Sequence, residues 1–160
     1  VRHARDNNWL IFASRDWHDA VTKHFAEYGG LWPSHCIMHT EGAEFHPKLE
    51  ITSALVISKG TERNSDGYSA FDGKSWAGQT FYYYLWVNNV EELYVGGLAT
   101  DYCVKASALD AVKRGLRTFL LLDACRAVNI KPGDGKKAVE EMKKSGVRVT
   151  TATEVLNDGS

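Results

Sequence analysis

Short apolar runs, separated by polar or amphipathic stretches, dominate the hydrophobic pattern of this chain. Runs of four to eight apolar residues are typical of strands that are buried on both faces of a sheet. The pattern therefore predicts strands at 9–14, 54–58, 92–98, 118–122 and 147–150.

The second half of the chain predicts helices between these strands. After 92–98, apolar residues recur at the 3.6-residue spacing of one helix face, and Gly115 is a suitable stop. A second helix is expected to open at Pro132 and Asp134 and to close at Gly146, and residues 77–88 predict a shorter one. Strands that alternate with helices predict an α/β fold, a three-layer sandwich with a central parallel β-sheet.

Two segments predict loops. Residues 16–50 are rich in aromatic residues, histidines, glycines and prolines, which indicates a long, ordered, functional loop with at most short helices. Residues 60–75 are polar and rich in Gly and Ser. With 160 residues, of which 44% are hydrophobic, the chain suits a single domain spanning 1–160.

Composition excludes several classes of protein. The formal net charge of −1 offers no basic excess for a nucleic-acid backbone, so no nucleic-acid partner is expected. No apolar run approaches the ~18–20 residues of a membrane span, so no membrane partner is expected either. Three cysteines are too few, and odd in number, for a disulfide scaffold. A cytoplasmic location, with free thiols, is the simplest interpretation.

Chemically active residues follow three of the predicted strands. Asp16 and His18 come after the first strand, Lys59 after the second and Cys103 after the third. In parallel α/β sheets the active site lies beyond the carboxyl ends of the strands. We therefore expect these side chains to open into one shared cleft.

Cys103 has the position of a nucleophile. Thr100 is a candidate N-cap, which would place Cys103 in the first helical turn, where backbone N–H groups favour a thiolate and can hold an oxyanion. Lys59 would stabilise the negative charge. The alternative for Cys103 is a small buried residue at a strand–helix junction. The alternative for Lys59 is a lysine at a strand end whose side chain extends to water.

Asp16 and His18 form an Asp-x-His pair, with His24 and His35 downstream. An extended backbone projects both members of such a pair to the same side. A carboxylate and imidazoles are normal ligands of zinc, iron or manganese. The alternative for each histidine is a hydrogen-bonded loop residue.

Taken together, five motifs resemble those of the nicotinamidases, which belong to the isochorismatase-like cysteine hydrolases. The resemblance covers nearly the whole chain in order. Its motifs lie at 14–18 (Ser-Arg-Asp-Trp-His), 31–36 (Leu-Trp-Pro-Ser-His-Cys), 58–60 (Ser-Lys-Gly), 67–71 (Gly-Tyr-Ser-Ala-Phe) and 97–106 (Gly-Leu-Ala-Thr-Asp-Tyr-Cys-Val-Lys-Ala).

The resemblance implies a role for each matching residue. Asp16, His18 and His35 match the metal ligands of the family, and His24 matches a fourth histidine found in some members. The family's metal binds the pyridine nitrogen of the substrate. Zinc is the first choice for this chain, and iron or manganese would accept the same ligands.

The same resemblance implies the catalytic and substrate-binding groups. Cys103 matches the nucleophile that forms a thioester, and Lys59 matches the catalytic lysine. The N–H groups of Ala99 and Cys103 match the oxyanion hole, with a cis peptide between Leu98 and Ala99. The residues that match the walls of the ring pocket are Trp32, Tyr68 and Leu98.

Hydrolysis of nicotinamide to nicotinate and ammonia, with pyrazinamide-type amides as further substrates, is the implied activity. The implied partner is a small-molecule amide, and a homo-oligomer is among the expected states because the superfamily commonly assembles. Two alternatives stay open. One is an amidase for a carbamoyl or ureido substrate that binds no metal, and the other is a catalytically incomplete binding protein of the same fold.

The sequence departs from the family pattern at its start. The family's first strand carries a catalytic aspartate and lies in the sheet between the strands that correspond to 9–14 and 93–98, yet it has no counterpart here. Without it, the sheet would have two unpaired edges. We therefore expect the domain to be incomplete at its N-terminus and an upstream segment to complete it. Neither Asp6 nor Asp101 suits the missing role.

Overall fold

The computed structural model describes residues 1–158. The chain divides into two compact units, Val1–Tyr84 and Leu85–Ser160. Each unit has a parallel sheet of its own. The single domain expected for 1–160 stays a prediction.

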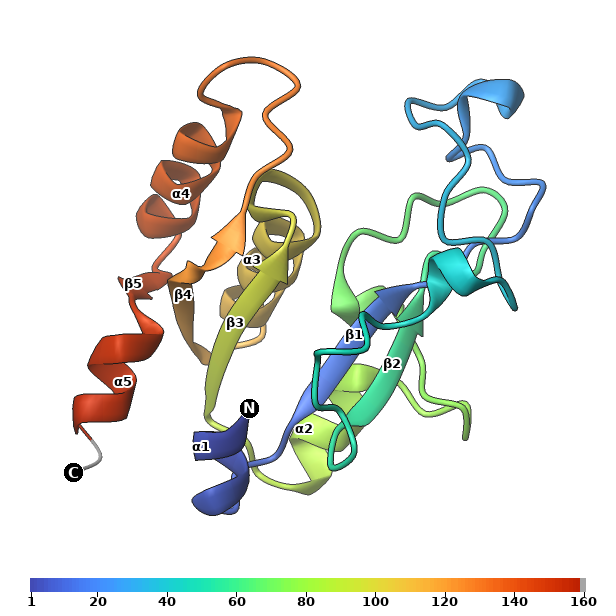
Figure 1. The fold of residues 1–160 in the computed structure, drawn as a ribbon. Coiled ribbons are helices and arrows are strands. Elements are labelled where there is room, and N and C mark those ends of the chain that lie inside the picture. Colours follow the sequence, from blue (N-terminus) through green and yellow to red (C-terminus); the bar gives the residue numbers. More distant parts are fainter. Residues whose placement is uncertain (159–160) are drawn as a thin grey trace. The chain divides into compact units, whose positions relative to one another are not determined.

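The first unit is built on two parallel strands, β1 (Phe12–Asp16) and β2 (Leu55–Lys59), which lie side by side in Figure 1. A short helix, α1 (Arg2–Asp6), precedes them. Strand β1 begins at Phe12, later than the apolar run suggested, because Trp9 and Leu10 are exposed outside the sheet. Both strands end one or two residues later than expected, so Asp16 and Lys59 are their last residues and are paired in register.

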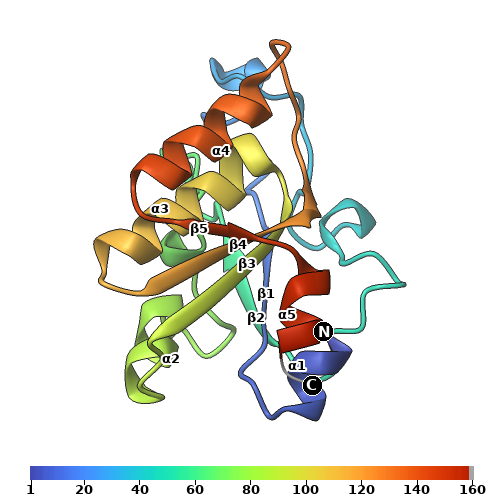
Figure 2. The same ribbon diagram turned by 90° about the vertical axis from the view of Figure 1, so that its left-hand side faces the viewer.

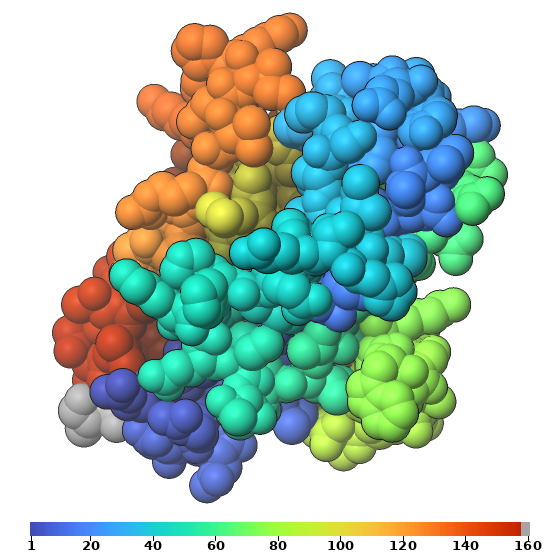
Figure 3. All heavy atoms as spheres, turned by 45° about the vertical axis from the view of Figure 1, so that its right-hand side comes forward, coloured from blue at the N-terminus to red at the C-terminus, as the bar shows by residue number. Residues whose placement is uncertain are grey.

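A long segment with little regular structure joins the two strands, as the sequence predicts. It contains only two 3₁₀ turns, η1 (Ala26–Tyr28) and η2 (Glu41–Ala43), among its described residues. In the space-filling view of Figure 3 its blue and teal atoms cover a broad area of the face shown. A third turn, η3 (Ala70–Asp72), follows β2, and α2 (Phe81–Val87) crosses the boundary between the units.

Aromatic packing closes the core of the first unit. The Phe81 ring lies between those of Phe12 and Phe71, with ring centroids 4.9 Å apart in both pairs and edge-to-face geometry. This geometry places the positive ring edge on the negative ring face and adds about 0.5–1.5 kcal/mol per pair to the gain from burial. These contacts hold α2 and η3 against β1.

The second unit contains a three-stranded parallel sheet in the order β3 (Glu92–Leu98), β4 (Arg117–Arg126) and β5 (Arg148–Thr150). The helices of this unit are, in chain order, η4 (Thr100–Val104, π-helical), α3 (Lys105–Lys113), α4 (Asp134–Lys144) and α5 (Ala152–Asp158). Glycines in the left-handed region follow α3 and α4, at Gly115 (φ +82°) and Gly146 (φ +100°), as predicted. Helix α5 and the length of β4 were not predicted.

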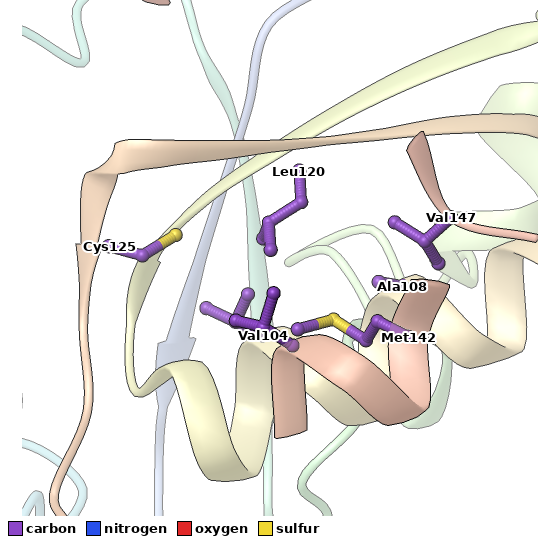
Figure 4. Packing of buried hydrophobic residues seen from close by; sticks show 7 residues of the cluster. Val104, Ala108, Leu120, Cys125, Met142 and Val147 are labelled. Atoms are coloured by element: carbon purple, nitrogen blue, oxygen red, sulfur yellow. The ribbon is translucent and has the colours of Figure 1, made fainter. Parts of the chain in front are cut away.

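One apolar cluster joins the helices and the sheet of this unit. Figure 4 shows Val104, Ala108 and Met142 from the helices facing Leu120 of β4. Ala108, Leu120 and Met142 are fully buried. Burying a Leu or Met side chain contributes about 1.5–3 kcal/mol. Figure 2, from a second direction, shows α3 and α4 along the same face of the sheet.

The architecture confirms the α/β class. Each strand pair is parallel, and helices connect the strands of the second unit. The described strands form two sheets, one with the order β1-β2 and one with the order β3-β4-β5. Within 1–158, no helix has both the length and the apolar character needed to cross a bilayer.

Candidate functional site

Asp16 and Lys59 meet at the carboxyl ends of β1 and β2. The register places them opposite each other, and Lys59 Nζ donates to Asp16 Oδ1 at 2.5 Å and to the carbonyl oxygen of Gly67 at 3.2 Å. Lys59 is 3% exposed, whereas the Asp16 side chain is 27% exposed. A buried ammonium requires such a partner because its desolvation is costly. Lys59 is therefore not a lysine that extends to water.

Three histidines gather in the loops that follow β1. His18, His24 and His35 each offer a ring nitrogen, and these nitrogens lie within 4.8 Å of one another. His18 is fully buried and His24 is 3% exposed. The His18 ring lies 4.5 Å from that of His24 and 5.0 Å from that of His35, centroid to centroid. This spacing fits one metal ion held by three imidazoles.

The hydrogen bonds of the three rings fix which nitrogen faces the cluster. Nδ1 of His18 donates to the Gly60 carbonyl at 2.9 Å, Nδ1 of His24 to Asp66 Oδ1 at 2.7 Å, and Nδ1 of His35 to the Pro33 carbonyl at 2.8 Å. Each acceptor is an oxygen without a hydrogen of its own. The proton must therefore sit on Nδ1, which leaves the lone pair on Nε2, as in metal-bound histidines.

Nε2 of His18 is a buried nitrogen without a hydrogen-bond partner among the described residues. An unsatisfied buried polar atom costs free energy, so its presence calls for a ligand. Burial lowers the pKa of His18, against the opposing effects of the Gly60 carbonyl and the Asp16 charge. His18 is thus neutral at pH 7, as a metal ligand must be. The donor set fits a divalent metal ion.

Asp16 lies beside the three histidines. Its Oδ1, bonded to Lys59, is 4.0 Å from His18 Nε2. The tightest group is therefore His18, His24 and His35, and it includes the histidine that the sequence offered only as a fourth ligand. A carboxylate has two oxygens, so Asp16 can contact both Lys59 and a metal ion.

Backbone contacts bring these distant histidines together. The N–H of His18 donates to the Cys36 carbonyl at 2.9 Å, which sets His35 beside His18. Gly60 adopts φ +67°, and a Cβ there would lie 2.4 Å from Cε1 of His18. Only glycine allows the backbone to approach the ring this closely.

Trp32 and Tyr68, both expected to line the pocket for the substrate ring, form a hydrogen bond with each other next to the histidines. Trp32 Nε1 donates to the Tyr68 hydroxyl at 2.8 Å. The His24 ring lies 6.2 Å from that of Trp32, nearly parallel to it, and 5.7 Å from that of Tyr68. Aromatic surface of this pair therefore lies beside the histidine cluster.

Cys103 lies in the second unit, just beyond the carboxyl end of β3. The peptide between Leu98 and Ala99 is cis, as the resemblance implies, and Leu98 is 74% exposed. Cys103 belongs to the π-helical turn η4, in which the N–H of Val104 donates to the Ala99 carbonyl at 3.1 Å. Such wide turns occur often at functional sites.

Thr100 is not the N-cap, and this prediction was wrong. Ala99 has the extended backbone of the cap position, and Thr100 is the first residue of the turn and is 4% exposed. An N-cap residue has non-helical backbone angles, whereas Thr100 is already part of the helical turn. The turn therefore begins one residue earlier than the threonine indicated.

Asp101 has a structural task in this unit. Its two carboxylate oxygens accept the N–H groups of Val128 and Asn129, at 2.9 and 2.8 Å, and so tie the loop after β4 to η4. These bonds agree with its exclusion as the missing catalytic aspartate. Asp6, also excluded, belongs to α1, before β1.

The other two thiols have different surroundings. Cys125 is 5% exposed and donates to the Leu121 carbonyl, and burial raises the pKa of its thiol. Cys36 adopts φ +45° beside His35. Among residues 1–158, no disulfide joins the cysteines.

The sequence analysis assigned no role to Asp66 or Gly60, which accept hydrogen bonds from His24 and His18. Asp66 directly precedes the Gly-Tyr-Ser-Ala-Phe motif and is the acceptor for His24. The signal in the sequence for Asp66 was its position next to that motif. Hydrophobic periodicity does not show which carboxylate contacts a histidine 42 residues away.

Residues 1–154 match the isochorismatase domain family. The chain belongs to this family. Among curated isochorismatase relatives, it is 40% identical to a nicotinamidase of Acinetobacter baylyi over 128 residues, 79% of this chain and 59% of that protein. It is 37% identical to an Escherichia coli nicotinamidase over 158 residues, 88% of this chain and 74% of the relative.

This chain is also similar to a solved structure. The pyrazinamidase of Pyrococcus horikoshii, crystallised in complex with zinc, matches with a TM-score of 0.82 and 41% identity, over 94% of this chain and 80% of that one. This chain thus spans less than two thirds of the Acinetobacter relative and most of the other two.

Proposed function

We propose that this isochorismatase-family protein hydrolyses nicotinamide to nicotinate and ammonia and also accepts pyrazinamide-type amides. The observation that carries the proposal is the set of three imidazoles whose candidate ligand nitrogens lie within 4.8 Å of one another, close to the Trp32–Tyr68 pair. The nicotinamidase and pyrazinamidase relatives support the substrate class.

The metal-binding residues in this proposal are His18, His24 and His35, with Asp16 as a further ligand. Zinc is the proposed metal, supported by the zinc complex of the Pyrococcus relative and by the three imidazole donors. A bound metal would supply a Lewis acid that holds the ring nitrogen of the substrate. Trp32 and Tyr68 would contact the faces of that ring, and Leu98 would line it.

Cys103 is the proposed nucleophile. Its sulfur attacks the carboxamide carbon, and the carbonyl oxygen takes up negative charge, which the N–H groups of Ala99 and Cys103 stabilise. Collapse of this intermediate breaks the C–N bond, and the nitrogen takes up the proton that the Cys103 thiol lost and leaves as ammonia. A thioester on Cys103 remains. Water then attacks the thioester carbon, and the products are nicotinate and the free thiol.

Lys59 has an electrostatic role in this scheme. Its ammonium is 3% exposed and donates to Asp16. Such a charge favours the thiolate over the thiol and stabilises negative charge that develops during attack.

Release of ammonia from nicotinamide by the purified full-length protein tests the proposal. We expect turnover that is lost in Cys103→Ala and retained in Cys125→Ala, which removes a thiol from the core instead. Elemental analysis should find one metal ion per chain, absent in His35→Ala. A protein that turns over a ureido substrate but not nicotinamide, without bound metal, would reject the proposal in favour of a carbamoyl or ureido amidase.

The catalytically incomplete binding protein is tested by the same assay. It predicts a folded protein that binds nicotinamide, with no ammonia release and no effect of Cys103→Ala. The cytoplasmic location and the homo-oligomer stay predictions.

A further inference from the structure

Residues 59–68 form one short segment that is hydrogen-bonded to several side chains in and around the histidine cluster. Lys59 bonds Asp16, the Gly60 carbonyl accepts from His18, and Asp66 accepts from His24. The Tyr68 hydroxyl accepts from Trp32 at the end of the same segment. The geometry of the site therefore depends on where this segment lies.

His24 differs from the other two histidines in its partner. His18 and His35 donate to neutral backbone carbonyls, whereas His24 donates to a carboxylate, at the shortest of the three distances, 2.7 Å. A carboxylate on Nδ1–H raises the electron density of the ring and makes Nε2 a stronger donor to a metal. Asp66 is 55% exposed and His24 is 3% exposed, so the charge stays hydrated while the ring is held in place.

The segment is anchored independently of Asp66. The Arg63 carbonyl accepts the N–H of Lys23 at 2.8 Å and the hydroxyl of Thr22 at 3.3 Å. The Arg63 side chain also pairs with Asp19 at 3.0 Å. Removal of the Asp66 charge should therefore change the chemistry of His24 without releasing the segment.

We propose that Asp66 is a positioning residue that fixes His24 with its proton on Nδ1 and strengthens Nε2 as a metal ligand. His24 then acts as a full ligand rather than as an occasional fourth one. This inference rests on the proposed metal-dependent function, but it concerns metal affinity alone.

The test measures the dissociation constant for Zn²⁺ by competition with a chelator, without substrate. Asp66→Asn keeps an oxygen that can accept from His24 and removes only the charge. Asp66→Ala removes both. We expect the affinity to fall by about 10–100-fold in Asp66→Ala and by less in Asp66→Asn. Asp66→Glu should restore part of the loss.

Two matched variants separate this role from a structural one. Glu62→Gln removes an exposed charge from the same loop, and Arg63→Ala removes the surface ion pair with Asp19. Both should stay within about threefold of the wild type, because exposed pairs contribute little. Co²⁺-loaded protein should show altered visible absorption in Asp66→Ala and an unchanged spectrum in Glu62→Gln.

The possible outcomes distinguish the two proposals. Wild-type protein that binds no Zn²⁺ would reject the metal-dependent function itself. Tight wild-type binding that is equal in both Asp66 variants, with identical Co²⁺ spectra, would overturn the role of Asp66 and leave the function standing. Equal losses in Asp66→Ala and Arg63→Ala would assign the effect to the loop as a whole, which also contradicts the inference.

Discussion

Lys59 Nζ and Asp16 Oδ1 lie 2.5 Å apart because β1 and β2 run parallel and end in register at these two residues. The two partners are unequal, since the ammonium is buried and the carboxylate is partly in contact with water. The carboxylate is therefore the group that makes burial of the lysine tolerable.

This inequality predicts an asymmetric effect on stability. Asp16→Ala leaves a buried ammonium without its carboxylate and should lower the free energy of unfolding by about 2–4 kcal/mol. Lys59→Met leaves only a partly hydrated carboxylate and should cost less, about 1–2 kcal/mol. Urea unfolding measures both, and a larger loss in Lys59→Met would contradict this account.

Removal of metal should lower both activity and stability. With free Zn²⁺ at 100 times its dissociation constant, binding to the folded state alone adds about 2.7 kcal/mol. The melting temperature should therefore rise with zinc and fall with a chelator, and His35→Ala should show no such response. A chelator that changes neither property would argue against the metal site.

Gly60 should not tolerate a side chain. In Gly60→Ala the new Cβ would meet the His18 ring in a backbone region unfavourable for alanine. We expect a loss of about 1–3 kcal/mol together with weaker zinc binding. Gly78→Ala is the matched control, since Gly78 also has a positive φ (+79°) but no atom within 4 Å of the added Cβ. A zinc affinity in Gly60→Ala equal to that in Gly78→Ala would contradict the role of close approach to His18.

Cys103 should be the most reactive thiol at neutral pH. Burial raises the pKa of Cys125, so its thiolate forms only above the ordinary pH range for a thiol and its alkylation at pH 7 is slow. Mass spectrometry after brief alkylation should find Cys103 modified faster than Cys125 by on the order of tenfold. Similar rates at both residues would favour the binding-protein alternative.

The Trp32–Tyr68 bond predicts an effect on substrate binding. Tyr68→Phe removes the acceptor of Trp32 Nε1 and loosens an aromatic wall beside the histidines. A lost bond of about 1 kcal/mol corresponds to a rise in KM of about fivefold. The value of kcat should change less, and an effect confined to kcat would assign Tyr68 a different role.

The sequence by itself determined the α/β class, the limits of β3 and the glycine stops of α3 and α4. These features follow from local hydrophobic periodicity and from the backbone freedom of glycine at a positive φ. It also determined the candidate groups at the strand ends, because the end of an apolar run marks the end of β1 and β2 to within one or two residues.

Only the tertiary structure decided which side chains of the first unit meet. The choice of His24 over Asp16 in the tightest cluster depends on loop contacts between residues about 40 positions apart, such as His18 with Gly60 and His24 with Asp66. Thr100 illustrates the same limit, since the helical turn begins at this residue and the cap position falls on Ala99. Local patterns set which elements form, but long-range packing sets which side chains share a site.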